Sequence, residues 1–364
     1  MPVTISEDIT GVASVNSGAI GGRRNIVYNG EMKVAQRGTV TGATSGDYGP
    51  DRFVLVETGA LVATLSQDTD VPTGQGFANS MKIDVTTADS SLAAGDLAFI
   101  GQRFEGQDLQ QLKKGTSSAE SVTLSFWVKT TITGTYIIQL YDNDNSRHIS
   151  KSYTVSSANT WEYKTLTFAG DTTGALDDDN AYSLQIYWWL AAGSNYTDGT
   201  LTTSWAAWND GNAAVGQVNA VNSASNNIYI TGVQMEIGAT ATDFEHRTFG
   251  DELALCQRYY FRETAGTTFA GFAIAVVEAV TYSSGMMRGL PVPMRSLPTC
   301  NVSNCRMFDG GAAPAITSLG NNWSSKTTWG VSVIGSAGGM TVGRACMLTA
   351  NNNILAYIEA TAEL

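Results

Sequence analysis

Basic residues are scarce in this chain of 364 residues, and their scarcity excludes one class of partner. The sequence has 21 Lys and Arg against 33 Asp and Glu, which gives a net charge of −12 and a pI near 4.6. A groove that neutralises phosphate groups needs clustered Lys and Arg side chains. The composition therefore predicts that nucleic acid is not a ligand.

Long apolar runs are also missing. None approaches the roughly 18 residues that a bilayer-spanning helix needs. Residues 1–8 contain neither the basic region nor the apolar region of a secretory signal peptide. We therefore expect a protein that does not insert into a membrane, is made in a cytoplasm and is not exported by the Sec route.

Cysteine is rare for this length, with Cys256, Cys300, Cys305 and Cys346 as the only four. No His or Cys lies near the Cys300–Cys305 pair at a spacing typical of zinc ligands. In a reducing compartment we expect free, mostly buried thiols. The alternative, for protein that has been released from a cell, is a disulfide between Cys300 and Cys305.

Groups suited to catalysis are few as well. The chain has two histidines, His148 and His246, and neither a Gly-x-Ser-x-Gly elbow nor a His-Glu-x-x-His motif. We therefore assign no catalytic residue and expect a protein that is not an enzyme. The alternative is a polysaccharide depolymerase, because two carboxylates at the right separation would suffice and the sequence does not show separations.

Glycine (38 residues) and small polar residues fill the gaps between short runs rich in β-branched and aromatic residues. Gly and Asn supply the positive φ of tight turns, and alternation of apolar and polar residues indicates half-buried strands. We predict an all-β fold whose main part is an antiparallel jelly-roll sandwich, followed by a smaller C-terminal β domain. The eight predicted strands of the sandwich are 52–57, 61–66, 80–85, 121–128, 135–141, 161–168, 182–190 and 227–235.

The same patterns divide the chain into four parts. Residues 1–24 are too poor in apolar side chains to order alone, so we expect an attachment arm, with an extra edge strand of its own domain as the alternative. Residues 25–248 form the jelly roll, with one short helical patch at 108–114. Residues 249–262 are a connector with a short helix or turn. Residues 263–364 form the smaller domain, with strands predicted at 269–277, 330–334 and 353–359.

Two motifs bracket the jelly roll. The opening motif has Asn25, Asn29, Gly30, Met32, Gln36, Arg37 and Gly38, followed by Asp51, Arg52 and Phe53. The closing motif runs through residues 233–238, 241–247 and 252–260. Together they resemble the motifs of a family found in tail fibre and receptor-binding proteins of bacteriophages and prophages. The match covers about two thirds of the chain.

The resemblance implies a homotrimeric virion protein with a carbohydrate-binding-like sandwich that adsorbs to a glycan on a bacterial surface. It implies a place in the virion tail after assembly in the host cytoplasm, with the arm docked on a tail or baseplate protein. The C-terminal domain is then the trimerising, receptor-facing end. The alternative is a virion decoration or head-fibre protein without a receptor role.

Residues of the two motifs are expected to close the sandwich and not to bind ligand. If the first and last strands pair, Asn29 and Glu236 come close together. Arg37 or Arg52 would then form a structural ion pair there.

A glycan site needs exposed aromatic faces for sugar C–H surfaces, with carboxylates or amides beside them for hydroxyls. Tyr187 and Trp189 point to the opposite side of a strand from Trp188, so at least one of these rings should face the core. The alternative role of the aromatic residues in this region is core packing or contacts within a trimer. The candidate glycan-binding residues are Trp188, Tyr196, Asp198, Trp205, Trp208 and Asp210.

Two oxygen-rich turns, at 142–145 and 177–179, are candidates for a structural Ca²⁺. Neither has the spacing of an EF-hand loop, and Asp-Asn runs are ordinary turn formers. No other cofactor is expected.

Overall fold

The computed structural model describes residues 14–15, 18–19, 23–336 and 338–364, and the chain forms two compact units that divide between Thr248 and Phe249. The attachment arm expected at residues 1–24 lies outside the described residues, apart from β1 (Ser14–Val15), β2 (Gly18–Ala19), Arg23 and Arg24. No helix among the described residues is long and apolar enough to span a membrane.

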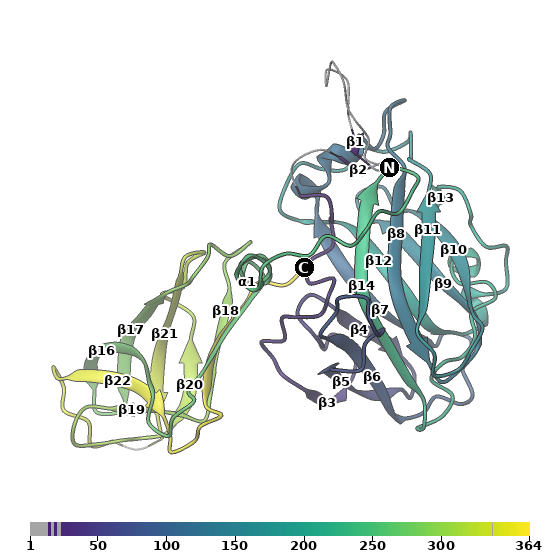
Figure 1. Ribbon diagram of the computed structural model, residues 1–364. Coiled ribbons are helices and arrows are strands. Elements are labelled where there is room, and N and C mark those ends of the chain that lie inside the picture. Colours follow the sequence, from purple (N-terminus) through teal and green to yellow (C-terminus); the bar gives the residue numbers. More distant parts are fainter. Residues whose placement is uncertain (1–13, 16–17, 20–22, 337) are drawn as a thin grey trace. The chain divides into compact units, whose positions relative to one another are not determined.

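The first unit is a sandwich of two six-stranded antiparallel sheets (Figure 1), which confirms the predicted jelly-roll class. The β7/β12 sheet has the order β13 (Ala206–Ala207), β10 (Arg147–Val155), β9 (Gly134–Asp142), β12 (Tyr182–Ala192), β7 (Leu97–Glu105), β4 (Val54–Thr58). The β8/β14 sheet has the order β11 (Glu162–Phe168), β8 (Val122–Thr130), β14 (Asn227–Ile237), β6 (Ser80–Thr87), β5 (Val62–Asp68), β3 (Val40–Ala43).

The period of two along each strand builds the core between these sheets. In β8, the side chain of Phe126 is fully buried and meets Trp188 of β12 with 6.2 Å between ring centroids. Trp188 is only 1% exposed. The prediction that Trp188 contacts a glycan is therefore wrong, because this ring packs inside the sandwich.

All eight predicted strands are present, but β3, β10 and β13 were missed, and so was β7. Its central residues are buried on both faces, so its sequence has the continuous apolar run Leu97-Ala-Phe-Ile100 and no alternation. The helical patch expected at 108–114 is instead two short 3-10 turns, η1 (Gly106–Asp108) and η2 (Gln110–Leu112). Lys113 ends the second turn in the left-handed conformation, with φ 49°.

The opening segment of the sandwich (residues 25–30) lies against β14. The N–H of Ile26 donates to the carbonyl of Met235 over 2.8 Å, and the N–H of Val233 donates to the carbonyl of Gly30 over 2.8 Å. The side chain of Asn25 adds one bond to the carbonyl of Val233 and accepts another from the N–H of Met235. Residues more than 200 positions apart in sequence therefore close one edge of the core.

Asn29 shapes the turn that follows. It adopts φ 56° and is fully buried, a conformation that Asn tolerates better than most residues. Its Nδ2 donates to the carbonyls of Val34 and Asp51, and its Oδ1 accepts from the N–H of Val34. The side chain thus replaces backbone hydrogen bonds that this irregular segment lacks.

Glu236 is held by partners other than those predicted. Its fully buried carboxylate accepts from the N–H of Thr242 over 2.9 Å, from Thr242 Oγ1 over 2.6 Å and from Gln234 Nε2 over 2.8 Å. Its cation is Arg24, with 3.5 Å between Nε and Oε2. The predicted ion pair with Arg37 or Arg52 is therefore wrong.

The two predicted cations have other contacts. The Arg37 guanidinium lies 4.6 Å from the centre of the Tyr48 ring. Arg52 Nη2 donates to the carbonyl of Arg103 over 2.7 Å. Both arginines come from the opening motif, whereas the cation that reaches Glu236 precedes that motif.

The second unit begins with α1 (Phe249–Gln257), so residues 249–262, expected as a connector, are part of its fold. One sheet has three strands in the order β15 (Tyr260–Thr264), β23 (Tyr357–Thr361), β18 (Thr299–Ser303). The other has six in the order β19 (Cys305–Phe308), β22 (Ala345–Ala350), β16 (Gly271–Ala279), β17 (Tyr282–Gly289), β21 (Thr328–Gly335), β20 (Ile316–Gly320). The smaller C-terminal β domain is thus confirmed.

The core of the second unit surrounds Trp329, whose indole N–H donates to the carbonyl of Glu359 over 2.9 Å. All four cysteines belong to this unit, and each is a buried free thiol. Burial raises the pKa of Cys305 to about 11, so this thiol stays protonated and unreactive at neutral pH.

Replacing Glu236 tests how strongly the closing segment depends on it. We expect Glu236→Ala to lower the free energy of unfolding by about 3 kcal/mol, because Arg24 loses its buried partner and the Thr242 and Gln234 donors lose their acceptor. Urea unfolding followed by tryptophan fluorescence measures this. The control is the exposed Asp178→Ala, which should change stability by less than about 0.5 kcal/mol; equal effects of the two changes would contradict the assignment.

Candidate functional site

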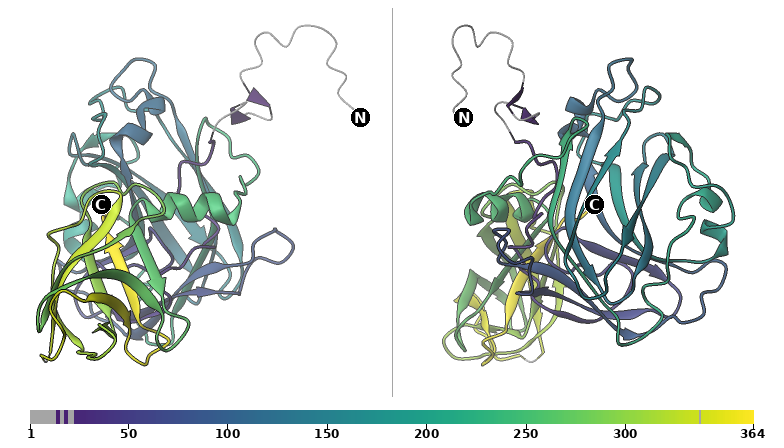
Figure 2. Two further views of the ribbon diagram at one scale, coloured as in Figure 1. Left: turned by 90° about the vertical axis from the view of Figure 1, so that its left-hand side faces the viewer. Right: turned by 45° about the vertical axis from the view of Figure 1, so that its right-hand side comes forward.

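The outer face of the β7/β12 sheet is covered by a loop. Phe99 and Tyr187 stack on this face with 4.1 Å between ring centroids, and Trp189 packs beside them. Residues 193–221 lie over these rings and bury Ala213 and Ala214 among them. The right-hand view in Figure 2 shows this loop outside the sandwich. The face is therefore a second, smaller core and not an open cleft.

Four of the glycan-binding candidates are brought together by this loop. Trp208 donates to Asp210 over 2.8 Å, and Tyr196 packs on Trp189 with 5.7 Å between centroids. Asp198 lies directly beside Gly211, the residue after Asp210. Burial and the charge of Asp210 raise the pKa of Tyr196. The rings of Tyr196 and Trp208 thus hold the loop on the sheet, while the two carboxylates are exposed.

Trp205 is separated from that group. Its indole N–H donates to the carbonyl of Ala169 over 2.8 Å, and the ammonium of Lys114 lies 5.1 Å from its ring centre. With Trp188 in the core and Trp205 at another place, the six candidates do not form one site.

A buried polar chain lies under the same loop. Trp189 donates to Gln139 Oε1 over 3.0 Å, and Gln139 Nε2 lies 2.8 Å from His148 Nδ1. Because indole only donates, the amide must donate to His148, and the neutral imidazole holds its proton on Nε2. Burial lowers the pKa of His148 to about 4, against a smaller opposing effect of Asp210.

The turn at 142–145 already holds a cation, the ammonium of Lys114. Its Nζ contacts the carboxylate of Asp142, lies 3.0 Å from Asp171 Oδ2 and donates to the carbonyls of Thr173 and Gly174. These are oxygen ligands of the kind that Ca²⁺ prefers. Asp177 approaches the same turn through its N–H, which donates to Asp144 over 3.0 Å.

This arrangement bears on the calcium hypothesis. Among the described residues, no three His, Cys, Asp or Glu side chains gather as a metal site. A structural Ca²⁺ at 142–145 would have to displace the Lys114 ammonium from Asp142. The ion therefore stays a prediction, with Lys114 as its competitor.

An open groove of about 380 Å³ lies on the outer face of the β8/β14 sheet. Trp127 and Tyr163 are register partners on β8 and β11, with 5.3 Å between their ring centroids, and Tyr163 is 46% exposed. The residues that line the groove are Gln75, Phe77, Ser125, Trp127, Tyr163, Gly232, Thr242, Asp243, Phe244 and His246.

Gly232 makes room for this groove. β14 has a bulge between Thr231 and Gln234, and Gly232 sits in it with φ 62°. A Cβ at this position would lie 2.6 Å from Phe77 Cζ and 3.1 Å from Trp127 Cδ1, so only glycine fits.

The closing segment (residues 239–247) forms the opposite wall. Thr242 is fixed by Glu236, and the N–H of Glu245 donates to Gln234 Oε1 over 2.8 Å. These bonds hold Phe244 against Phe77, with 5.1 Å between centroids in an edge-to-face arrangement. His246 packs on both rings. The hydrogen bonds that close the sandwich thus also position the aromatic wall.

A second aromatic group continues the same face. Lys129 and Trp161 each stand two residues from a groove residue, Trp127 and Tyr163, and so face the same side. The Lys129 ammonium lies 4.5 Å from the Tyr229 ring centre and 5.6 Å from that of Trp161. Asp70 accepts from Lys129 and Trp161. Burial raises its pKa, but these two bonds, together with the charges of Lys129 and Lys82, outweigh burial and leave the pKa lowered.

The sequence interpretation missed Trp127, Tyr163, Phe77 and Phe244. A signal was present, since Trp127 alternates with the core residues Phe126 and Val128 and therefore points outward. Gathering Phe77 and Phe244 beside it depends on contacts between residues at least 50 positions apart in sequence, which no local pattern shows.

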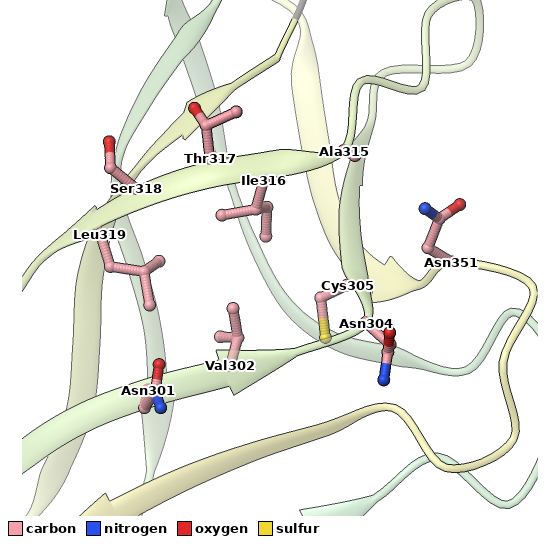
Figure 3. Close-up of a pocket in the computed structure, with 10 residues that line it drawn as sticks. All are labelled: Asn301, Val302, Asn304, Cys305, Ala315, Ile316, Thr317, Ser318, Leu319 and Asn351. Atoms are coloured by element: carbon pink, nitrogen blue, oxygen red, sulfur yellow. The ribbon is translucent and has the colours of Figure 1, made fainter.

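A second cavity, of about 430 Å³, lies in the second unit between β18 and β20. Figure 3 shows Val302 of β18 pointing toward Ile316 and Leu319 of β20, while Thr317 and Ser318 point away. None of its lining residues is aromatic or charged; the rim has the amides Asn301, Asn304 and Asn351. It lacks the ring faces that distinguish the groove on the first unit.

Comparison with solved structures finds similarity to part of the chain. The enzymatically active domain of tailspike protein 4 of bacteriophage CBA120 matches 59% of this chain at 18% identity and a TM-score of 0.32, and the match spans 21% of that structure. A family 11 carbohydrate-binding module of a Clostridium thermocellum cellulase matches 57% of this chain and all of the module at 13% identity and a TM-score of 0.28.

A xylan-binding domain from Paenibacillus barcinonensis matches 61% of this chain and all of that domain, at 9% identity and a TM-score of 0.28. No protein-family model and no curated protein sequence matches this chain.

The buried His148 predicts an acid-sensitive sandwich. The unfolded chain takes up a proton near pH 6.5 but the folded chain only near pH 4, so stability is lost as the pH falls through this window. The loss reaches at most about 3 kcal/mol. Urea unfolding from pH 7 to 4 should show it in the wild type relative to His148→Gln; a stability difference that does not change with pH would contradict it.

The Lys114 cluster yields a second prediction. Lys114→Ala should lower the free energy of unfolding by about 3 kcal/mol in a chelator, because Asp142 and Asp171 lose a shared cation. Millimolar Ca²⁺ should restore part of this loss by binding the vacated oxygens. Lys113→Ala, which removes an exposed neighbour paired with Glu120, is the matched control and should cost less than about 1 kcal/mol. Equal stabilities of the two variants would refute the role of Lys114.

Proposed function

We propose that this chain is a receptor-binding protein of a bacteriophage tail fibre that adsorbs to a bacterial surface glycan. The observation that carries the proposal is the open aromatic groove on the β8/β14 sheet. Its rings are fixed by neighbours on three strands and on the closing segment, and the ring of Tyr163 is exposed.

The lining of the groove suits a neutral, hydroxyl-rich ligand. It contains no Lys or Arg, so it offers no site for a phosphate or sulfate group. The faces of Trp127 and Tyr163 suit the C–H surface of a sugar ring, and Asp243, Thr242 and Gln75 line the same groove with groups that can hydrogen-bond to hydroxyls. A volume of about 380 Å³ falls within the usual range for small-ligand sites.

The virion assignment is supported by the opening and closing motifs, which resemble those of phage tail fibre proteins. In this structure the closing motif supplies Thr242, Asp243, Phe244 and His246 to the groove. The same proposal includes a homotrimer, an N-terminal arm docked on a tail or baseplate protein, and a place in the tail. A decoration or head-fibre protein would share the fold but bind no host glycan.

A panel of purified bacterial O-antigen and capsular polysaccharides tests the binding function. A polysaccharide that binds the wild type should bind Trp127→Ala at least about tenfold more weakly, because a stacking face is lost. Phe249→Ala removes an exposed aromatic side chain from the second unit, away from the groove residues, and should leave affinity unchanged. Equal affinity of the wild type and Trp127→Ala would reject the groove.

Two further outcomes separate the alternatives. Loss of binding in Trp208→Ala but not in Trp127→Ala would move the site to the loop on the other sheet. Release of reducing ends from the bound polysaccharide would replace adsorption with depolymerase activity. Failure of the wild type to bind any host surface would favour the decoration protein.

A further inference from the structure

The exposed apolar surface of this protein is concentrated in its second unit. Among the described residues, fourteen large hydrophobic side chains are exposed, and thirteen of them lie in that unit. The exception is Tyr163, which belongs to the aromatic groove. Where such side chains are contiguous, the surface marks an interaction site.

Part of this surface is a continuous row across the six-stranded sheet. Strand register places Phe308 opposite Met347, Met347 opposite Ile274, and Ile274 opposite Met287. Directly opposite residues share one face, so these side chains form one line over β19, β22, β16 and β17. Ile274 is 70% exposed, Met287 51% and Met347 41%.

The row is extended by Trp323. Met287 is opposite Gly330 of β21, and a Cβ at Gly330 would lie 2.4 Å from the carbonyl oxygen of Trp323 and 3.0 Å from its Cβ. Trp323 therefore rests on the outer side of β21 where a side chain is missing, and it is 47% exposed. The apolar row thus runs from β19 to β21.

The charge of the chain is divided unequally between its units. Residues 249–364 have seven acidic and seven basic side chains, so the second unit is electrically neutral. Residues 1–248 have 26 acidic and 14 basic side chains and hold the whole net charge of −12. Copies of the chain therefore repel one another through their first units but not through their second.

We infer that the apolar row on β19, β22, β16 and β17 is the surface through which copies of this chain associate. The members of the row are uncharged, so two copies can bury it without burying a carboxylate. Sheets that pack face to face lie about 10 Å apart with interdigitated side chains, which suits a flat row of Ile, Met and Phe. A neutral unit has no charge complementarity with a basic or acidic partner, whereas it fits another neutral unit.

The association of copies through the apolar row strengthens the proposed adsorption to a glycan. This consequence rests on the proposed function. Association through the second units uses no residue of the groove in the first unit. Several grooves on one assembly then bind a repeating polysaccharide with an avidity that one groove lacks.

The mass in solution tests the inference. Light scattering of the wild type should give a multiple of 38.6 kDa, and Ile274→Asp should give one chain. The control, Val342→Asp, introduces the same charge at an apolar residue that is 58% exposed and outside the row; it should keep the wild-type mass. Unchanged thermal unfolding of Ile274→Asp shows that the unit still folds. A wild type that is monomeric at every concentration, or an Ile274→Asp protein of wild-type mass, overturns the inference.

A measurement on the unmodified protein does not depend on a variant. Peroxide should oxidise Met287 and Met347 much more slowly than added free methionine at high protein concentration, and at nearly the free rate after dilution to monomer. Oxidation at the free rate at all concentrations would show that the row stays uncovered. If Ile274→Asp is monomeric and still binds polysaccharide through its single groove, assembly has failed while the glycan site is intact. Failure of assembly and failure of the glycan site are thus distinguished.

Discussion

The buried hydrogen bonds of β14 are the constraint on which the rest of the first unit depends. Glu236 and Gln234 point to the outer face of their sheet, where a charge and an amide would normally meet water. Instead the closing segment folds over them and satisfies them with Thr242, Glu245 and Arg24. On the same strand, the opening segment bonds to Val233 and Met235. A buried carboxylate is costly unless paired, so these partners hold both ends of the sandwich chain in place.

That closure also decides where a ligand can bind. The two outer faces of the sandwich both have aromatic rows, yet they differ in access. A loop covers Phe99, Tyr187 and Trp189 and turns their face into a second core. The face with Trp127 and Tyr163 stays open, because the bulge at Gly232 and the closing segment form walls without a lid. The same residue types thus stabilise one face and offer a recognition surface on the other.

The two units differ in net charge and in exposed apolar surface. The first has the acidic charge and the open aromatic groove, while the second is neutral and has nearly all the exposed large apolar side chains among the described residues. A buried cation of the first unit is supplied by the chain itself. Lys114 takes the place between Asp142 and Asp171 that a metal ion would need, so a side chain of the same unit stabilises these two carboxylates.

The sequence by itself determined the β class and eight strands of the sandwich, since these follow from turn residues and a period of two, and it placed a short helix or turn at 249–262. It missed β3, β10 and β13, and also β7, whose two buried faces erase that period, and it assigned Trp188 to a ligand and Arg37 or Arg52 to Glu236. Tertiary structure alone decided which face a loop would cover, that Arg24 reaches Glu236, and that Phe77 and Phe244 join Trp127. Those outcomes depend on which distant segments meet, and local patterns contain no information on such contacts.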